Sequence, residues 1–141
     1  MDLELKKYLY QLSNKNIDKN NIIMNLGLLI EKNLSKNNPT DYILLLPSSI
    51  VNISIDSKDI DEIVDILLHL LKTEPVYTSR IVWCIGKTFD ENKIETLLLT
   101  IIQSNFCDDE TFKQIQFLID VIKNETIILL FGKISRLNQR Y

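Results

Sequence analysis

The side chains able to carry out chemistry are few and widely separated in this chain of 141 residues. His69 is the only histidine, and it lies between Asp65 and Lys72 on one polar stripe. Cys84 and Cys107 are 23 residues apart, and neither has a base near it in the sequence. A nucleophile needs a base within hydrogen-bond reach, and a metal site needs several ligands at a defined spacing. We therefore predict that the protein is not an enzyme and uses no metal and no cofactor.

One dense cluster of carboxylates, the Asp-Asp-Glu run at residues 108–110, has two interpretations. It could hold a divalent cation or act as a carboxylate pair. It also stands where a helix is expected to begin, and a carboxylate there caps free backbone N–H groups and favours the helix dipole. We favour the capping role. His69 is in turn predicted to be a solvated surface residue, and the two cysteines to be buried as small apolar side chains.

These residues are positioned by a segment that repeats itself. Moving residues 60–121 by 34 positions superimposes the large apolar side chains. The pairs are Ile60 and Ile94, Ile63 and Leu97, Val64 and Leu98, Leu67 and Ile101, Leu68 and Ile102, Ile81 and Ile115, Trp83 and Phe117, and Ile85 and Ile119. A period of this length is typical of stacked helical hairpins, in which no single unit buries its apolar face alone. Trp83 and Phe117 are expected to occupy equivalent core positions.

The apolar spacing predicts helices over residues 2–12, 17–34, 60–71, 76–89, 94–103, 110–123 and 125–136. Ser57 or Asp59 is the expected N-cap of the third of these. Residues 40–58 are ambiguous, because Val51, Ile53 and Ile55 alternate with polar residues as in a strand. A single strand would have no partner, so we expect a short helix followed by an extended connector. The fold class is therefore all-α, a single domain made of an irregular stack of about six or seven antiparallel helices.

Residues 77–91 resemble one repeat of the HEAT family. In that family the second helix of a hairpin has an arginine near its start and a small residue and a glycine near its end, followed by Asp-Glu. The residues at matching positions are Arg80, Gly86, Asp90 and Glu91. The usual alanines of the family are replaced by Val82 and Cys84. The resemblance implies antiparallel helical hairpins and a role in binding other macromolecules.

The charge is distributed unevenly along the chain. Residues 56–125 contain fourteen Asp and Glu against seven Lys and Arg, a net charge of −7, whereas residues 126–141 carry +3. An acidic surface disfavours nucleic-acid phosphates and favours basic partners. In size, charge and helical class the chain is similar to bacterial immunity proteins, which neutralise the catalytic domain of a secreted toxin. The resemblance implies a bacterial protein. We expect it to be cytoplasmic, because two isolated cysteines form no disulfide framework and no apolar run is long enough to span a membrane.

We accordingly expect a non-enzymatic protein-binding module, a monomer that pairs with one basic partner such as a nuclease toxin domain. The expected partner-binding residues are Asp59, Asp61, Glu62, Asp65, Asp90, Glu91, Asp108, Asp109 and Glu110. The alternative for each of these acids is that it only caps a helix or belongs to a solvated face. A scaffold subunit of a larger complex is a second hypothesis. A nucleic-acid binder is a third, and it would need a basic face built from Arg80, Lys87, Lys133, Arg136 and Arg140.

Overall fold

The protein is described here from a computed structural model, which defines residues 1–34 and 46–140. Those residues form seven α-helices and no strand, which confirms the all-α prediction. The helices are α1 (Leu3–Tyr10), α2 (Asn20–Leu34), α4 (Ser57–Thr73), α5 (Thr78–Gly86), α6 (Glu91–Ser104), α7 (Asp109–Val121) and α8 (Glu125–Asn138). Two short 3-10 turns, η1 (Gln11–Ser13) and η2 (Pro75–Tyr77), follow α1 and precede α5.

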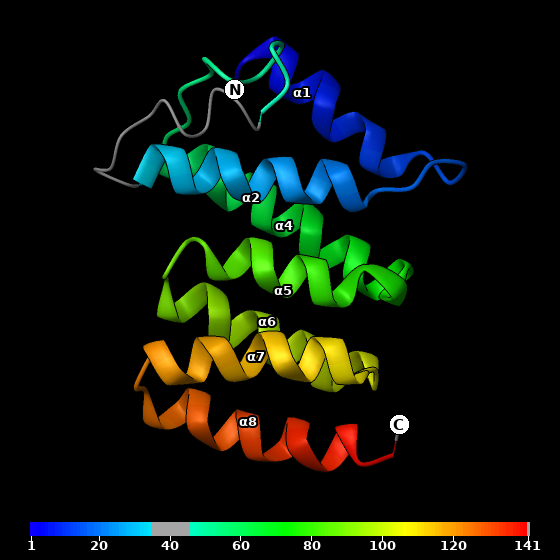
Figure 1. The fold of residues 1–141 in the computed structure, drawn as a ribbon, viewed down its shortest axis with the longest axis vertical. Helices are drawn as coiled ribbons and strands as arrows, with labels where there is room; N and C mark the ends of the chain where they lie inside the picture. Colours follow the sequence, from blue (N-terminus) through cyan, green and yellow to red (C-terminus); the bar gives the residue numbers. More distant parts are fainter. Residues whose placement is uncertain (35–45, 141) are drawn as a thin grey trace.

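The helices pack in two layers that extend along the long axis of the molecule (Figure 1). One layer contains α2, α5 and α7, and the other contains α4, α6 and α8. Consecutive helices alternate between the layers and run in opposite directions, so α4 with α5 and α6 with α7 form antiparallel hairpins. The first helix, α1, lies across the end of the stack beside α2. The predicted stack of antiparallel hairpins is therefore present.

Capping residues define where most helices begin. Asp90 accepts hydrogen bonds from the backbone N–H groups of Asn92 and Lys93 at the start of α6, and Asp108 accepts one from Thr111 N in α7. The cap of α4 is Asp56, whose carboxylate accepts from Asp59 N at 2.8 Å while the Asp59 carboxylate accepts from Asp56 N at 3.2 Å. This reciprocal arrangement is a capping box, and it satisfies two N–H groups that the helix itself leaves free. The prediction that Ser57 or Asp59 is the N-cap was therefore wrong by one to three residues.

In the α4 and α6 layer, the side chains that the 34-residue spacing superimposes agree in burial. Five of the superimposed pairs lie in α4 and α6. In four of them both residues are buried, and in the fifth, Leu68 and Ile102, both are half-buried. In the other layer the prediction fails at Phe117, which is 68% exposed, whereas its counterpart Trp83 is half-buried. The expectation that Phe117 is a core residue was therefore wrong.

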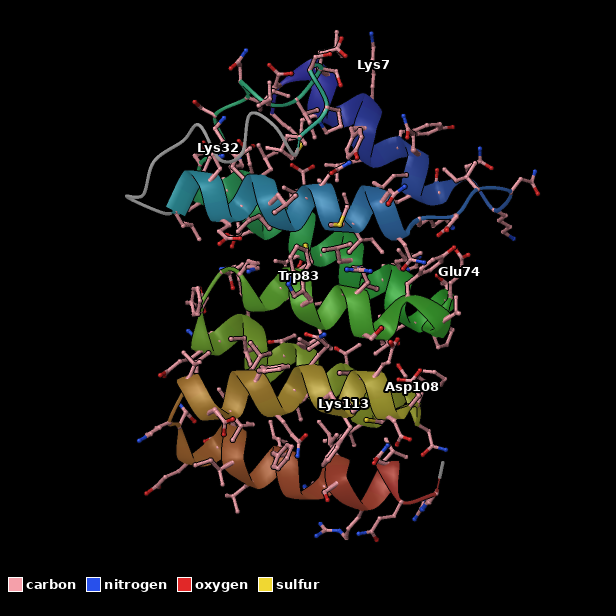
Figure 2. The ribbon with its side chains drawn as sticks, viewed as in Figure 1. Lys7, Lys32, Glu74, Trp83, Asp108 and Lys113 are labelled. Atoms are coloured by element: carbon pink, nitrogen blue, oxygen red, sulfur yellow. The ribbon has the colours of Figure 1, made fainter. Side chains whose placement is uncertain are left out.

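Glycine contacts explain the difference between Trp83 and Phe117. Trp83 lies on α5 (Figure 2). Its ring lies against Gly27 of α2, and an added Cβ on Gly27 would stand 2.4 Å from the ring. The corresponding contact between α5 and α7 is made by Leu118 on Gly86, where an added Cβ would stand 2.6 Å away. The packing side chain of α7 thus comes one residue later than the repeat predicts. One residue along a helix is a rotation of about 100°, so Phe117 turns out of the interface.

The ambiguous segment is only partly described, since residues 40–45 lie outside the defined part of the chain. Residues 53–56 have no regular secondary structure, although the burial alternates as predicted. The backbone of this segment is held to the end of α2: Lys32 Nζ donates to Val51 O, and Ile55 N donates to Asn33 Oδ1 at 3.2 Å. The alternation therefore reflects an extended connector that lies along a helix. No helix in the defined residues is long and apolar enough to cross a membrane.

Candidate interaction surface

The nine acids expected to bind a partner divide into two groups. Six of them are held by contacts within the protein: Asp59 in the capping box, Asp61 and Asp90 on Lys93, Glu91 on Asn124, Asp108 in the cap of α7, and Asp109 on Asn138. The side chains of Glu62, Asp65 and Glu110 make no ion pair or hydrogen bond to any defined residue, and all three are exposed. For six of the nine predicted acids, contacts within the protein are therefore enough to explain why an acid stands at that position.

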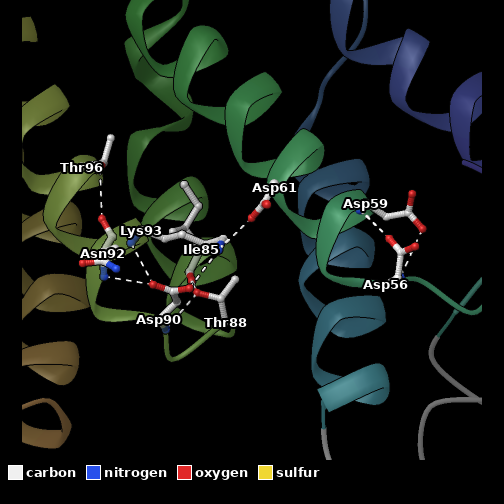
Figure 3. A network of polar contacts seen from close by, with 9 residues as sticks. All are labelled: Asp56, Asp59, Asp61, Ile85, Thr88, Asp90, Asn92, Lys93 and Thr96. Carbon is white, nitrogen blue, oxygen red and sulfur yellow. Dashed lines mark hydrogen bonds and ion pairs between the residues drawn. The ribbon is translucent and has the colours of Figure 1, made fainter.

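The best-connected acids form a bridge between α4 and α6 (Figure 3). Lys93 Nζ lies 2.8 Å from Asp61 Oδ1 and 2.9 Å from Asp90 Oδ2. The hydrogen bond from Lys93 holds the pKa of the Asp90 carboxyl below its usual value, and the hydrogen bond to Asp61 raises the pKa of Lys93. The lysine thus joins two hairpins at their surface. Two carboxylates share one cation, so this cluster carries a net charge of −1.

The helix directions place the predicted acids at two opposite edges of the molecule. Because α4 and α6 run in the same direction, their first turns lie at one edge, as Figure 1 shows. The first turn of α7 lies at the other edge, where Asp108 is labelled in Figure 2. The acids of α4 and α6 are therefore brought together, whereas the Asp-Asp-Glu run at residues 108–110 is separated from them. The nine acids therefore do not lie on one surface that a single partner could cover.

A ridge on α4 is the strongest candidate for partner binding. Glu62, Asp65, His69 and Lys72 are all exposed, as the polar stripe predicted. A groove of about 330 Å³ lies on the α6 side of this ridge and includes Asp61, Asp65 and Lys93 in its lining. A groove of about 850 Å³ lies on the α1 side and includes Glu62 and His69. We name the exposed face of Glu62, Asp65 and His69 the α4 ridge.

The larger groove contains residues that the sequence analysis did not identify. Its lining includes the apolar side chains of Leu9, Leu12, Ile66 and Leu70, together with Lys6 and Tyr10 of α1 and Lys15 of the following turn. Tyr10 is 79% exposed. The amphipathic pattern of residues 2–12 predicted the helix, but its placement against α4 depends on contacts 50 or more positions apart in the sequence. No local signal could have assigned these residues to a groove.

The thiols and the histidine do not assemble a reactive site. Cys84 and Cys107 are both buried, and burial raises the pKa of each thiol to about 12. A thiol with such a pKa is almost entirely protonated at neutral pH and is a poor nucleophile. No group of three or more His, Cys, Asp or Glu that could hold a metal ion occurs in the defined residues.

The cations that a nucleic-acid binder would need are distributed over both layers. Arg80 of α5 and Lys87, just past its end, lie beside the ring of Trp83, at 6.0 and 5.0 Å from its centroid, and Lys87 pairs with Glu31 at 3.2 Å. Lys133 and Arg136 belong to α8, in the other layer. The two pairs therefore do not form one continuous basic face.

Comparison with protein-family models, with curated proteins and with solved structures finds no match to this chain.

Proposed function

We propose that the chain is a non-enzymatic protein-binding module that uses the α4 ridge to hold a basic protein partner. The observation that supports the proposal most directly is the pair Glu62 and Asp65. Both carboxylates are exposed, lie one turn apart on the same helix, and have no partner among the defined residues. Since Asp59 and Asp61 are already engaged within the protein, Glu62 and Asp65 are the carboxylates of α4 still available to a cationic partner.

The two grooves beside the ridge supply the apolar contacts that carboxylates alone cannot. Affinity in protein interfaces comes mainly from a few desolvated side chains, whereas surface charges chiefly set the association rate and the choice of partner. In the larger groove the half-buried side chain of Ile66 and the exposed ring of Tyr10 are the apolar surface open to a partner side chain. A bacterial toxin domain with a cationic catalytic cleft is the partner class that we propose, and the chain would then act as its immunity protein.

The test is capture of partners by the tagged full chain from its own cells, followed by mass spectrometry. We expect one stoichiometric basic protein that is released by high salt and is toxic when it is expressed alone. Reversing the ridge charges with the double variant E62K/D65K should abolish capture. The matched control is E125K, which reverses an exposed acid in the first turn of α8.

The control separates the proposed surface from a general effect of charge. Loss of the partner with E62K/D65K but not with E125K would support the ridge. Equal capture by all three proteins would reject it. A fixed set of larger subunits, retained at high salt, would instead indicate a scaffold subunit and would reject the toxin-inhibitor role.

A further inference from the structure

Helix α7 carries an exposed apolar strip that the α4 ridge does not use. Phe117 is 68% exposed and Val121, one turn later, is 64% exposed. Large apolar side chains exposed this close together are a common mark of an interaction site. A groove of about 390 Å³ runs beside Phe117 and includes Ile119 and Phe131 in its lining. The strip thus combines a protruding aromatic ring with a hollow that could receive one.

Along the same face of α7, the order of charges is such that a copy of the helix running in the opposite direction would place opposite charges next to each other. The exposed residues are Glu110, Lys113, Gln116, Phe117, Asp120 and, just past the end of the helix, Lys123. When the helix is set against a reversed copy of itself, with the centre between Gln116 and Phe117, Lys113 faces Asp120 at both ends. The same register brings Glu110 towards Lys123. A parallel arrangement would instead place like charges opposite each other, which is unfavourable.

We propose that α7 is an interface between two copies of this chain, which pair antiparallel about a two-fold axis near Phe117. A two-fold interface uses the same surface on both copies, so each favourable contact occurs twice. Phe117 of each copy lies next to the axis and enters the groove beside α7 of the other. A second copy is the occupant that we assign, because the order of charges matches its own reverse.

The pairing departs from the monomer that the sequence analysis assumes, and it leaves the α4 ridge accessible. Helix α7 belongs to the layer of α2 and α5, whereas α4 belongs to the other layer (Figure 1). A pair of copies joined through α7 would therefore present two ridges. The inference does not depend on the function proposed above, since it concerns a different helix and a different occupant.

The test is sedimentation velocity of the full chain over a range of concentrations. We expect wild-type protein to show a concentration-dependent dimer. Each single reversal, K113E or D120K, puts two like-charged pairs into the interface and should weaken dimerisation by about tenfold. The double variant K113E/D120K exchanges the charges and should restore the wild-type dimer. F117S should abolish it, and K133E, an exposed reversal on α8, should leave it unchanged.

The substituted side chains are exposed, so at a protein concentration too low for dimerisation we expect every variant to melt at the same temperature as wild type, which is the check on folding. A wild-type chain that remains monomeric at its highest soluble concentration would overturn the proposal. So would a double variant that dimerises no better than the single variants. If the chain is monomeric and F117S loses a captured protein, the strip binds a different protein, and pairing between copies is rejected.

Discussion

Among the defined residues Lys19 is the charged side chain with no exposed surface, and its surroundings explain how the charge is tolerated. Its ammonium group is paired with the Glu74 carboxylate and lies 5.8 Å from the centroid of the Tyr77 ring. Its backbone N–H donates to Tyr77 Oη at 3.3 Å. The pair joins the start of α2 to the turn between α4 and α5. A buried charge is stable only when it is paired, so the two partners should respond differently to substitution.

We expect E74Q to destabilise the protein by about 3 kcal/mol, because it leaves the Lys19 ammonium buried without a counter-charge. K19M should cost about 1 kcal/mol, since the remaining Glu74 side chain is 33% exposed and can be hydrated. Urea unfolding of both variants gives the comparison. If K19M lowered the free energy of unfolding as much as E74Q or more, the ion pair with Glu74 would not be what makes the buried Lys19 charge stable.

Asp90 combines two roles that substitution can separate. D90A removes the N-cap of α6 and the ion pair with Lys93, whereas D90N keeps a side chain that caps well. We expect D90A to cost about 1 kcal/mol more than D90N. The ion pair itself should contribute less than about 1 kcal/mol, because it lies at the surface. Chemical denaturation at neutral pH measures both differences, and D61N is the control that loses a Lys93 partner without losing a cap.

The Asp90 ion pair also predicts a dependence on pH. Because the folded-state pKa of Asp90 is lower than its unfolded value, the pair stabilises the protein above the unfolded pKa and the contribution is lost as the pH falls through the folded pKa. The raised pKa of Lys93 gives the opposite sign, with stability present below its unfolded pKa and lost as the pH rises through the folded one. The difference between wild type and D90N should therefore disappear in acid. A difference that persisted there would mean that the carboxylate charge is not its source.

At the scale of whole helices, the two glycines Gly27 and Gly132 predict opposite effects of the same substitution. Alanine is favoured over glycine inside a helix by about 1 kcal/mol. G132A should therefore stabilise α8 by up to that amount, since an added Cβ would meet no atom within 4 Å. G27A would place its methyl group against the Trp83 ring, and overpacking of this kind costs about 1–3 kcal/mol. Thermal unfolding should show a raised midpoint for G132A and a lowered one for G27A.

At the scale of the molecule, the two buried thiols report whether the stack unfolds as one unit. Cys84 lies in α5 and Cys107 in the turn before α7. With the pKa of each at about 12, neither should react with an alkylating reagent at neutral pH while the protein is folded. We expect both thiols to become reactive over the same range of urea concentration, which peptide mapping by mass spectrometry can follow. Reaction of Cys107 at lower urea than Cys84 would show that the hairpins unfold one after another, as stacked repeats can.

The sequence by itself determined the helices and the core of the α4 and α6 layer. Apolar spacing reports which side of a helix is buried, and the acidic run at residues 108–110 marks a helix start because capping is a local interaction. The cap of α4 lies at Asp56 and not at the predicted Ser57 or Asp59. The tertiary structure alone decided which faces stay exposed. Phe117 and Trp83 have the same sequence signal, yet a one-residue change in the contact between α5 and α7 leaves only Phe117 outside the packing. The larger groove likewise depends on where α1 settles against α4, and that is fixed by long-range contacts that no local pattern encodes.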